Sequence, residues 1–135
     1  MSAKHVQVSA IASPPGGEPL VDYGTYTPTL GGVMGNVASS AAFPCQWMRV
    51  GNIVTVSGRV AVTPTASTTH TQIGISLPVA STFTQTGQCA GTGAFEYSTV
   101  AAALVVATGT LAYLIFTSQS TAQHSVWFTF TYQIL

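Results

Sequence analysis

Residues 126–134 read VWFTFTYQI, and this stretch decides the fold class. Apolar and polar side chains alternate along it, with one apolar face made of Val126, Phe128, Phe130, Tyr132 and Ile134. Successive side chains of a β-strand point to opposite faces. The alternation therefore predicts a strand that turns one face toward a core and the other toward solvent.

Two further segments carry the same kind of signal. Residues 53–62, IVTVSGRVAV, alternate in the same way, and Gly51-Asn52 before them is typical of a tight turn. We therefore expect a hairpin with residues 45–50. Residues 100–116 are uncharged and apolar, but Gly109 interrupts them and the run is too short for a membrane-spanning helix. Two strands joined by a turn explain this run, and no membrane insertion is expected.

The rest of the chain continues the β pattern. Residues 72–76 and 88–97 are also expected to be strands, which gives seven or eight short strands separated by Gly, Pro and Thr turns. Val, Ile, Thr, Phe and Tyr are frequent, and these residue types favour strands. The predicted fold is all-β, an antiparallel β-sandwich of jelly-roll type with an extended N-terminal arm. Residues 1–22 are assigned to the arm and residues 23–135 to the sandwich domain.

The arm carries the signs of a segment that orders against a partner. Pro14 and Pro15 favour extended backbone, and the glycines after them interrupt regular structure. Val6, Val8 and Ile11 could form a short strand on the surface of another subunit. We predict partner contacts at these five residues.

Charge is scarce in this chain. Only 4% of its 135 residues are charged and the net charge is zero, while 47% are hydrophobic. An ordinary soluble domain carries roughly 25% charged residues. The balance offers no basic surface for nucleic acid, and it suits a subunit whose surface is covered in an assembly.

The same scarcity argues against catalysis. Glu96 is the one carboxylate after residue 22, so a carboxylate pair cannot form in the predicted domain, and no nucleophile elbow or phosphate loop is present. We predict no enzyme activity, no cofactor and no metal. One alternative stays open: a threefold axis could gather three copies of His70 around a metal. Cys45 and Cys89 are expected to be buried thiols, with a disulfide as the alternative.

Four residues of the domain are predicted to contact other subunits or partners. Arg49, Arg59 and Glu96 could form an inter-subunit ion pair, with ordinary solvation as the alternative. Trp127 shares the Thr-rich face of the last strand and is expected to be exposed or at a contact. A second possibility for the aromatic residues is a sugar-stacking platform; it draws on Trp47, Tyr97, Tyr113 and Trp127.

Several linked blocks of the chain resemble a known family. They are GTYTPTL (residues 24–30), CQWMRVGNIVTVSGRV (45–60), GISLPVAS (74–81) and FTFTYQI (128–134). Together they resemble small β-structured domains of tailed-bacteriophage virion proteins. The resemblance spans about residues 24–135, and it implies a non-enzymatic β-sandwich knob that is usually trimeric.

The length of the chain favours one role within that family. A fibre tip is held on a long shaft, whereas this chain adds only a short arm to the domain. We therefore expect a homotrimeric capsid decoration (cement) protein that binds the major capsid protein at the virion surface after synthesis in the host cytoplasm. The alternative is a receptor-binding knob of a tail or head fibre, with residues 63–71 and 81–88 contacting a host cell-surface receptor or glycan.

Overall fold

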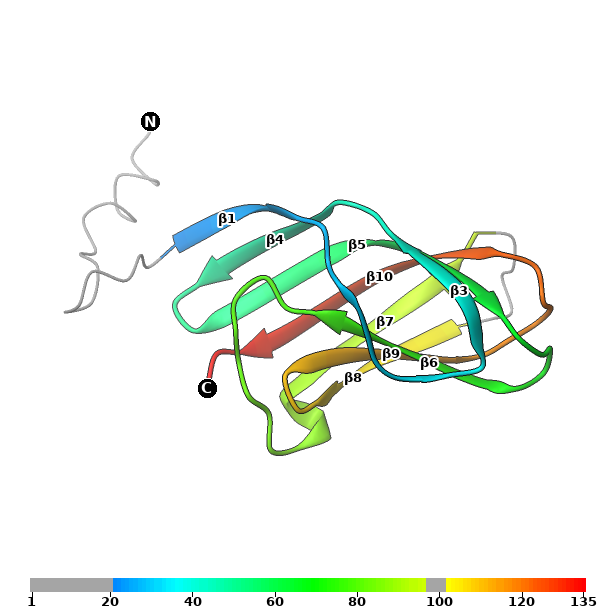
Figure 1. Cartoon of the computed structure of the whole chain (residues 1–135). Coiled ribbons are helices and arrows are strands. Elements are labelled where there is room, and N and C mark those ends of the chain that lie inside the picture. The colour runs from blue at the N-terminus through cyan, green and yellow to red at the C-terminus, as the bar shows by residue number, and fades with distance from the viewer. Residues whose placement is uncertain (1–20, 97–101) are drawn as a thin grey trace.

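The protein is built from antiparallel β-strands. A computed structural model describes residues 21–96 and 102–135, and within these ranges it contains ten strands, one 3₁₀ turn and no α-helix. The elements are β1 (Val21–Tyr26), β2 (Leu30–Gly35), β3 (Val37–Ala42), β4 (Cys45–Val50), β5 (Ile53–Pro64), β6 (His70–Ser76), η1 (Thr86–Gln88), β7 (Cys89–Phe95), β8 (Ala102–Thr108), β9 (Leu111–Thr117) and β10 (His124–Gln133) (Figure 1). The predicted all-β antiparallel class is confirmed.

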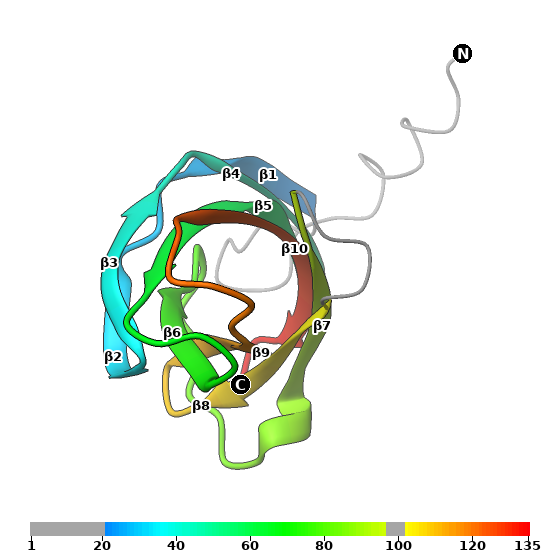
Figure 2. The same ribbon diagram turned by 90° about the vertical axis from the view of Figure 1, so that its right-hand side faces the viewer.

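All ten strands belong to one sheet that curls around the core. Its order is β1-β4-β5-β10-β7-β8-β9-β6-β2, and β3 pairs with β5. Only Asn36 separates β2, which pairs with β6, from β3, which pairs with β5. Residues 30–42 therefore connect the two ends of the strand order. Figure 2 shows the result from the end, with β10 and β6 on opposite sides of the interior. The sheet thus has an inner face, a closely packed core, and an outer face.

Strand β5 is the longest strand and shares one edge between two partners. Its first half pairs with β4 and its second half with β3. Between them lies Gly58, on the inner face. A Cβ at Gly58 would lie 2.7 Å from the Cβ of Cys45 and closer still to its sulfur, so only glycine fits there. This close approach lets the chain pass from β3 to β4 through Phe43 and Pro44, which reach the outer face beside Arg59.

The core lies where the alternating sequences predict it. The inward-facing apolar side chains of β5 and β10 are buried, and so are those of β6, β8 and β9. On the outer face of the same strands, Ile53, Leu104 and Trp127 are exposed. The rings of Phe128 and Phe130 stack with centroids 5.8 Å apart, and Phe83 meets Tyr132 edge to face at 5.8 Å. Such aromatic pairs add about 0.5–1.5 kcal/mol each beyond the area they bury.

The predicted strands are present, and three more precede them. The hairpin of residues 45–50 and 53–62 is confirmed, and so is the pair of strands on either side of Gly109. β1, β2 and β3 raise the expected seven or eight strands to ten. Residues 30–42 are rich in Gly, Ala and Ser, which have weak strand preference, and tertiary pairing with β5 and β6 decides their conformation.

The boundary of the arm differs slightly from the prediction. β1 begins at Val21 and pairs fully with β4, so Val21 and Asp22 belong to the sheet. The predicted contacts at Val6, Val8, Ile11, Pro14 and Pro15 lie outside the described residues. No helix within the described ranges is long and apolar enough to cross a membrane.

Candidate functional site

The outer face of strands β1, β4, β5, β10 and β7 presents its side chains in rows. Antiparallel pairing places residues of neighbouring strands directly opposite one another, so side chains line up across the sheet. In order along the strands the rows are Val21–Val50–Ile53–Gln133, then Tyr23–Met48–Thr55–Thr131–Ala90, then Thr25–Gln46–Ser57–Thr129–Thr92, and last Arg59–Trp127–Ala94. Among these side chains Arg59 is the one that carries charge.

The first two rows contain a cluster of exposed apolar side chains, which we call the edge patch. Tyr23 is 77% exposed and Met48 is 52% exposed. The other members of the patch are Val21, Val50 and Ile53, all classed as exposed. Scattered exposed apolar residues are normal on a monomer, but a contiguous group on one sheet face marks a contact surface.

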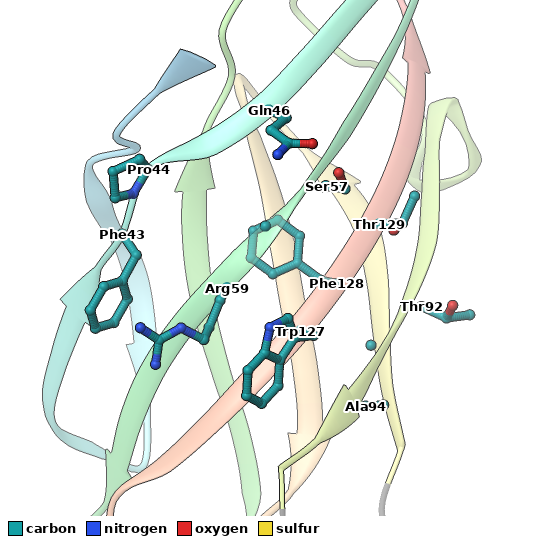
Figure 3. Close-up of a pocket in the computed structure, with 12 residues that line it drawn as sticks. Phe43, Pro44, Gln46, Ser57, Arg59, Thr92, Ala94, Trp127, Phe128 and Thr129 are labelled. Atoms are coloured by element: carbon teal, nitrogen blue, oxygen red, sulfur yellow. The ribbon is translucent and has the colours of Figure 1, made fainter.

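Beside the last row lies Phe43, and the guanidinium of Arg59 stacks with the rings of Phe43 and of Trp127 in that row. The central carbon of the Arg59 guanidinium lies 3.7 Å from the centroid of Phe43 and 5.7 Å from that of Trp127. Figure 3 shows the guanidinium between the two rings. Arg59 also donates a hydrogen bond to Ser125 Oγ at 3.0 Å. Cation–π contacts of this kind hold the three side chains in a defined arrangement on the outer face. We call Phe43, Arg59 and Trp127 the stacked row.

A groove of about 710 Å³ lies over the stacked row and the row next to it (Figure 3). Four neutral polar side chains of that next row line it: Gln46, Ser57, Thr129 and Thr92. We call the three that carry hydroxyl groups, Ser57, Thr129 and Thr92, the hydroxyl row. The stacked row forms the other half, with Pro44, Gly58, Gly93, Ala94 and Phe128 completing the lining. The groove therefore combines aromatic surface with hydrogen-bonding groups, the usual make-up of a small-molecule site.

The predicted contact residues lie at different places. Trp127 is 46% exposed, as expected, and lines the groove with Arg59. Arg49 stands opposite Asp22 of β1, and its Nε donates to the carbonyl oxygen of Gly51 at 2.7 Å. Arg49 pairs with Val54 of β5, five positions before Arg59, so the two arginines are roughly 17 Å apart along the sheet.

Glu96 approaches Arg59 only through a shared neighbour. The backbone N–H of Glu96 donates to the carbonyl oxygen of Ser125, whose hydroxyl accepts from Arg59. Within the chain the Arg59 guanidinium is thus held by Ser125 and the two rings of the stacked row. Whether Glu96 meets an arginine of another subunit stays a prediction.

The predicted aromatic platform is only partly assembled. Trp47 packs against the core, Tyr113 is buried, and Tyr97 lies outside the described residues. Trp127 finds a different companion, Phe43, which the sequence alone did not single out. The signal was the Phe43-Pro44 pair directly before a strand, but its position beside Arg59 follows from the way β5 divides one edge between β3 and β4.

Asn36 and Ser118 hold the loop at residues 65–69 in place. The side-chain amide of Asn36, a residue with φ +62°, donates to the carbonyl oxygen of Ala66 at 2.9 Å and to Thr71 Oγ1 at 2.8 Å. Ser118 Oγ lies 2.6 Å from the same Ala66 oxygen and accepts from the Thr69 N–H at 3.1 Å. Since Thr71 and Ser118 are fully buried, this network fixes the loop to the sheet.

The second loop predicted to contact a receptor is also anchored. In residues 81–88, Ser81 and Phe83 are buried, and Ser81 Oγ donates to the carbonyl oxygen of Gln133 at 3.0 Å. Gln88 Oε1 accepts from the Thr84 N–H at 2.7 Å. Thr82 and the tip at residues 84–87 are exposed. A receptor contact through this loop stays a prediction.

The cysteines are free thiols in the interior. Burial raises the pKa of the Cys89 thiol to about 12 and that of the Tyr132 phenol to about 12, although a hydrogen bond with the Val79 backbone opposes the second shift. Burial also raises the pKa of Cys45. Since the thiolate is the reactive form of cysteine, both thiols serve as packing groups near neutral pH.

The two histidines in the described part of the chain, His70 and His124, make contacts within the chain. His70 Nε2 lies 3.3 Å from Gln72 Oε1, and His124 Nε2 lies 3.0 Å from Ser120 Oγ. Over the described ranges, no group of three or more His, Cys, Asp or Glu side chains is placed to hold a metal ion. A site shared by three copies of His70 stays a prediction.

Comparison of the chain with protein-family models, with curated proteins and with solved structures found no match. The features of the molecule that bear on function are the edge patch and the groove, which lie side by side on the outer face.

Proposed function

We propose that the chain is a non-enzymatic structural subunit of a bacteriophage virion, a trimeric capsid decoration (cement) protein. The observation that carries the proposal is the edge patch. Tyr23, Met48 and their neighbours leave apolar surface exposed, and Arg59 is the one charged side chain in the four rows to which they belong. A surface of this kind is best suited to being covered by another protein.

The position of the patch favours association between copies of the chain. β1 is the last strand at its end of the sheet, so its outer edge presents backbone groups that another strand can pair with. Covering the half-exposed side chains of the patch contributes about 1–2 kcal/mol each, against the general cost of association. The virion role itself is supported by the family resemblance and by the arm that precedes β1.

Binding to capsid shells tests this role. The whole chain is mixed with expanded, DNA-free shells of the phage, and bound protein is counted after sedimentation. A deletion of residues 1–20 removes the arm and leaves β1 intact, which a deletion through residue 22 would not. We expect the whole chain to decorate the shells and the deletion to lose binding. Full decoration by the deletion variant contradicts the arm mechanism, and no binding by the whole chain contradicts the decoration role.

The second candidate is the receptor-binding knob, and the groove is the observation that favours it. The two predicted receptor loops are held to the sheet, whereas the groove offers an open surface with the exposed ring of Trp127. This function predicts that the purified protein adsorbs to host cells and competes with infection. If the protein at saturating concentration neither adsorbs to host cells nor competes with infection, the receptor-binding function is ruled out.

A further inference from the structure

We infer that the groove is a binding site for a neutral oligosaccharide, with Trp127 as the surface on which a sugar ring stacks. The inference deepens the second candidate function, and it rests on that function only in placing the saccharide on a host surface. A decoration protein with the same groove would bind the same ligand.

The first argument is the pairing of aromatic and hydroxyl surface. A pyranose ring exposes C–H groups on its faces and hydroxyl groups around its rim, so it needs an aromatic face and hydrogen-bonding partners beside it. Trp127 is 46% exposed and supplies the first. Ser57, Thr129 and Thr92, which stand opposite one another on three adjacent strands, supply the second.

The second argument is the spacing. Ser57 precedes Arg59 by two residues on β5, and Thr129 follows Trp127 by two residues on β10. Two residues along a strand span roughly 7 Å, which is close to the width of a sugar ring with its hydroxyl groups. A ring stacked on Trp127 therefore brings its rim within reach of the hydroxyl row. The groove is largely open to solvent, and its volume of about 710 Å³ leaves space for further rings.

The third argument is charge. No carboxylate lines the groove, and its only cation is Arg59. The guanidinium is stacked against Phe43 and gives one of its five N–H donors to Ser125. A polyanion needs several cations, as nucleic acids and sulfated chains do. The groove therefore selects a ligand recognised by stacking and neutral hydrogen bonds, with Arg59 donating to a hydroxyl group.

Rigidity supports the assignment as well. Trp127, Thr129, Ser57 and Arg59 stand on the two central strands of this face, which pair along ten residues. A site on paired strands is held more precisely than a site on a loop, and the contacts of Arg59 with Phe43 and Ser125 restrain its side chain before a ligand binds.

Titration with defined trisaccharides tests the inference. Maltotriose, cellotriose, mannotriose and N,N′,N″-triacetylchitotriose serve as probes at up to about 10 mM, a range suited to weak binding, and 3′-sialyllactose serves as the acidic comparison. Heteronuclear NMR follows the two indole N–H resonances. We expect at least one neutral probe to shift the resonance of Trp127 while that of Trp47, which packs against the core, stays in place.

Variants then locate the site. Trp127→Ala is expected to weaken binding at least tenfold, and Arg59→Lys several-fold, because lysine keeps the charge but loses the planar stack. Met34→Ala is the matched control, since Met34 is an exposed apolar side chain outside the groove. Circular dichroism establishes that each variant is folded, and the indole shift in the unsubstituted chain needs no variant at all.

Each result bears on the inference. A shift of Trp127 with a neutral probe, abolished by Trp127→Ala, supports it. Unchanged affinity in Trp127→Ala, shifts confined to other residues, no binding by any neutral probe, or binding of 3′-sialyllactose alone overturns it. If the unsubstituted chain binds a neutral trisaccharide but does not adsorb to host cells, the receptor role is contradicted and the saccharide site is not. The failure of the proposed function is therefore distinguishable from the failure of the inference.

Discussion

Replacing Ser118 with alanine is expected to lower the free energy of unfolding by about 2–4 kcal/mol. Ser118 Oγ lies 2.6 Å from the carbonyl oxygen of Ala66, 3.1 Å from the Thr69 nitrogen and 3.3 Å from Asn36 Nδ2. The hydroxyl donates to the first and accepts from the other two. Each buried hydrogen bond contributes about 1 kcal/mol, and the partners left without one add a desolvation cost.

Thermal unfolding at one fixed protein concentration measures this loss. For a chain of 135 residues the unfolding entropy is about 0.3 kcal/mol/K. The substitution should therefore lower Tm by about 7–14 °C. Ser67→Ala, in the same loop but at an exposed position, is the matched control and should change Tm by less than about 2 °C.

A second variant separates the network from the loop backbone. Asn36→Gly keeps a residue that tolerates φ +62° but removes the amide that donates to Ala66 and Thr71. It should cost about as much as Ser118→Ala, and the two together should cost less than their sum. If Ser118→Ala melts within about 2 °C of the unsubstituted protein, the network does not hold the loop and the reasoning is refuted.

Two further predictions concern the interior. Gly58→Ala should lower the free energy of unfolding by about 2–3 kcal/mol because its Cβ would overlap Cys45. Adding Cys45→Ala should recover part of this loss in urea unfolding. If the costs of the two substitutions are strictly additive, the contact between the two residues is contradicted. Stability should also fall as pH rises from about 9 to 12. The Cys89 thiol, ordinarily at 9.0, and the Tyr132 phenol, ordinarily at 10.0, both have a folded pKa of about 12, so the unfolded chain releases these protons first. Urea midpoints at pH 8 and 10.5 measure the effect, and Cys89→Ala should flatten it; equal midpoints for the unsubstituted protein would argue against burial of these groups.

Much of the architecture could be predicted from the sequence because a period of two is a local signal. The alternation in residues 126–134 and 53–62 identifies both strands and their inner faces without any knowledge of their partner strands. β2 and β3 could not be found in this way, since residues 30–42 have few strand-forming side chains. Their conformation depends on pairing with distant strands.

The candidate site shows the same division. The exposure of Trp127 could be predicted from its place on the Thr-rich face, which depends only on alternation. Its stacking partners could not, because Phe43 lies beside Arg59 only where the partner of β5 changes from β4 to β3. The face of Trp47 could not be predicted in the same way, because β4 mixes apolar and polar side chains on both faces, and the structure turns Trp47 toward the core.

The proposed trimer depends on the edge patch being covered where copies of the chain meet. Sedimentation equilibrium at about 10 µM tests this assembly most directly, with the whole chain measured beside the variants Met48→Lys and Thr86→Lys. Met48 lies at the centre of the patch, and Thr86, which is exposed in η1, is the control. We predict a trimer for the unsubstituted chain and for Thr86→Lys, and a monomer for Met48→Lys. A monomeric unsubstituted chain, or a Met48→Lys variant that stays fully trimeric, would contradict the assembly through this patch.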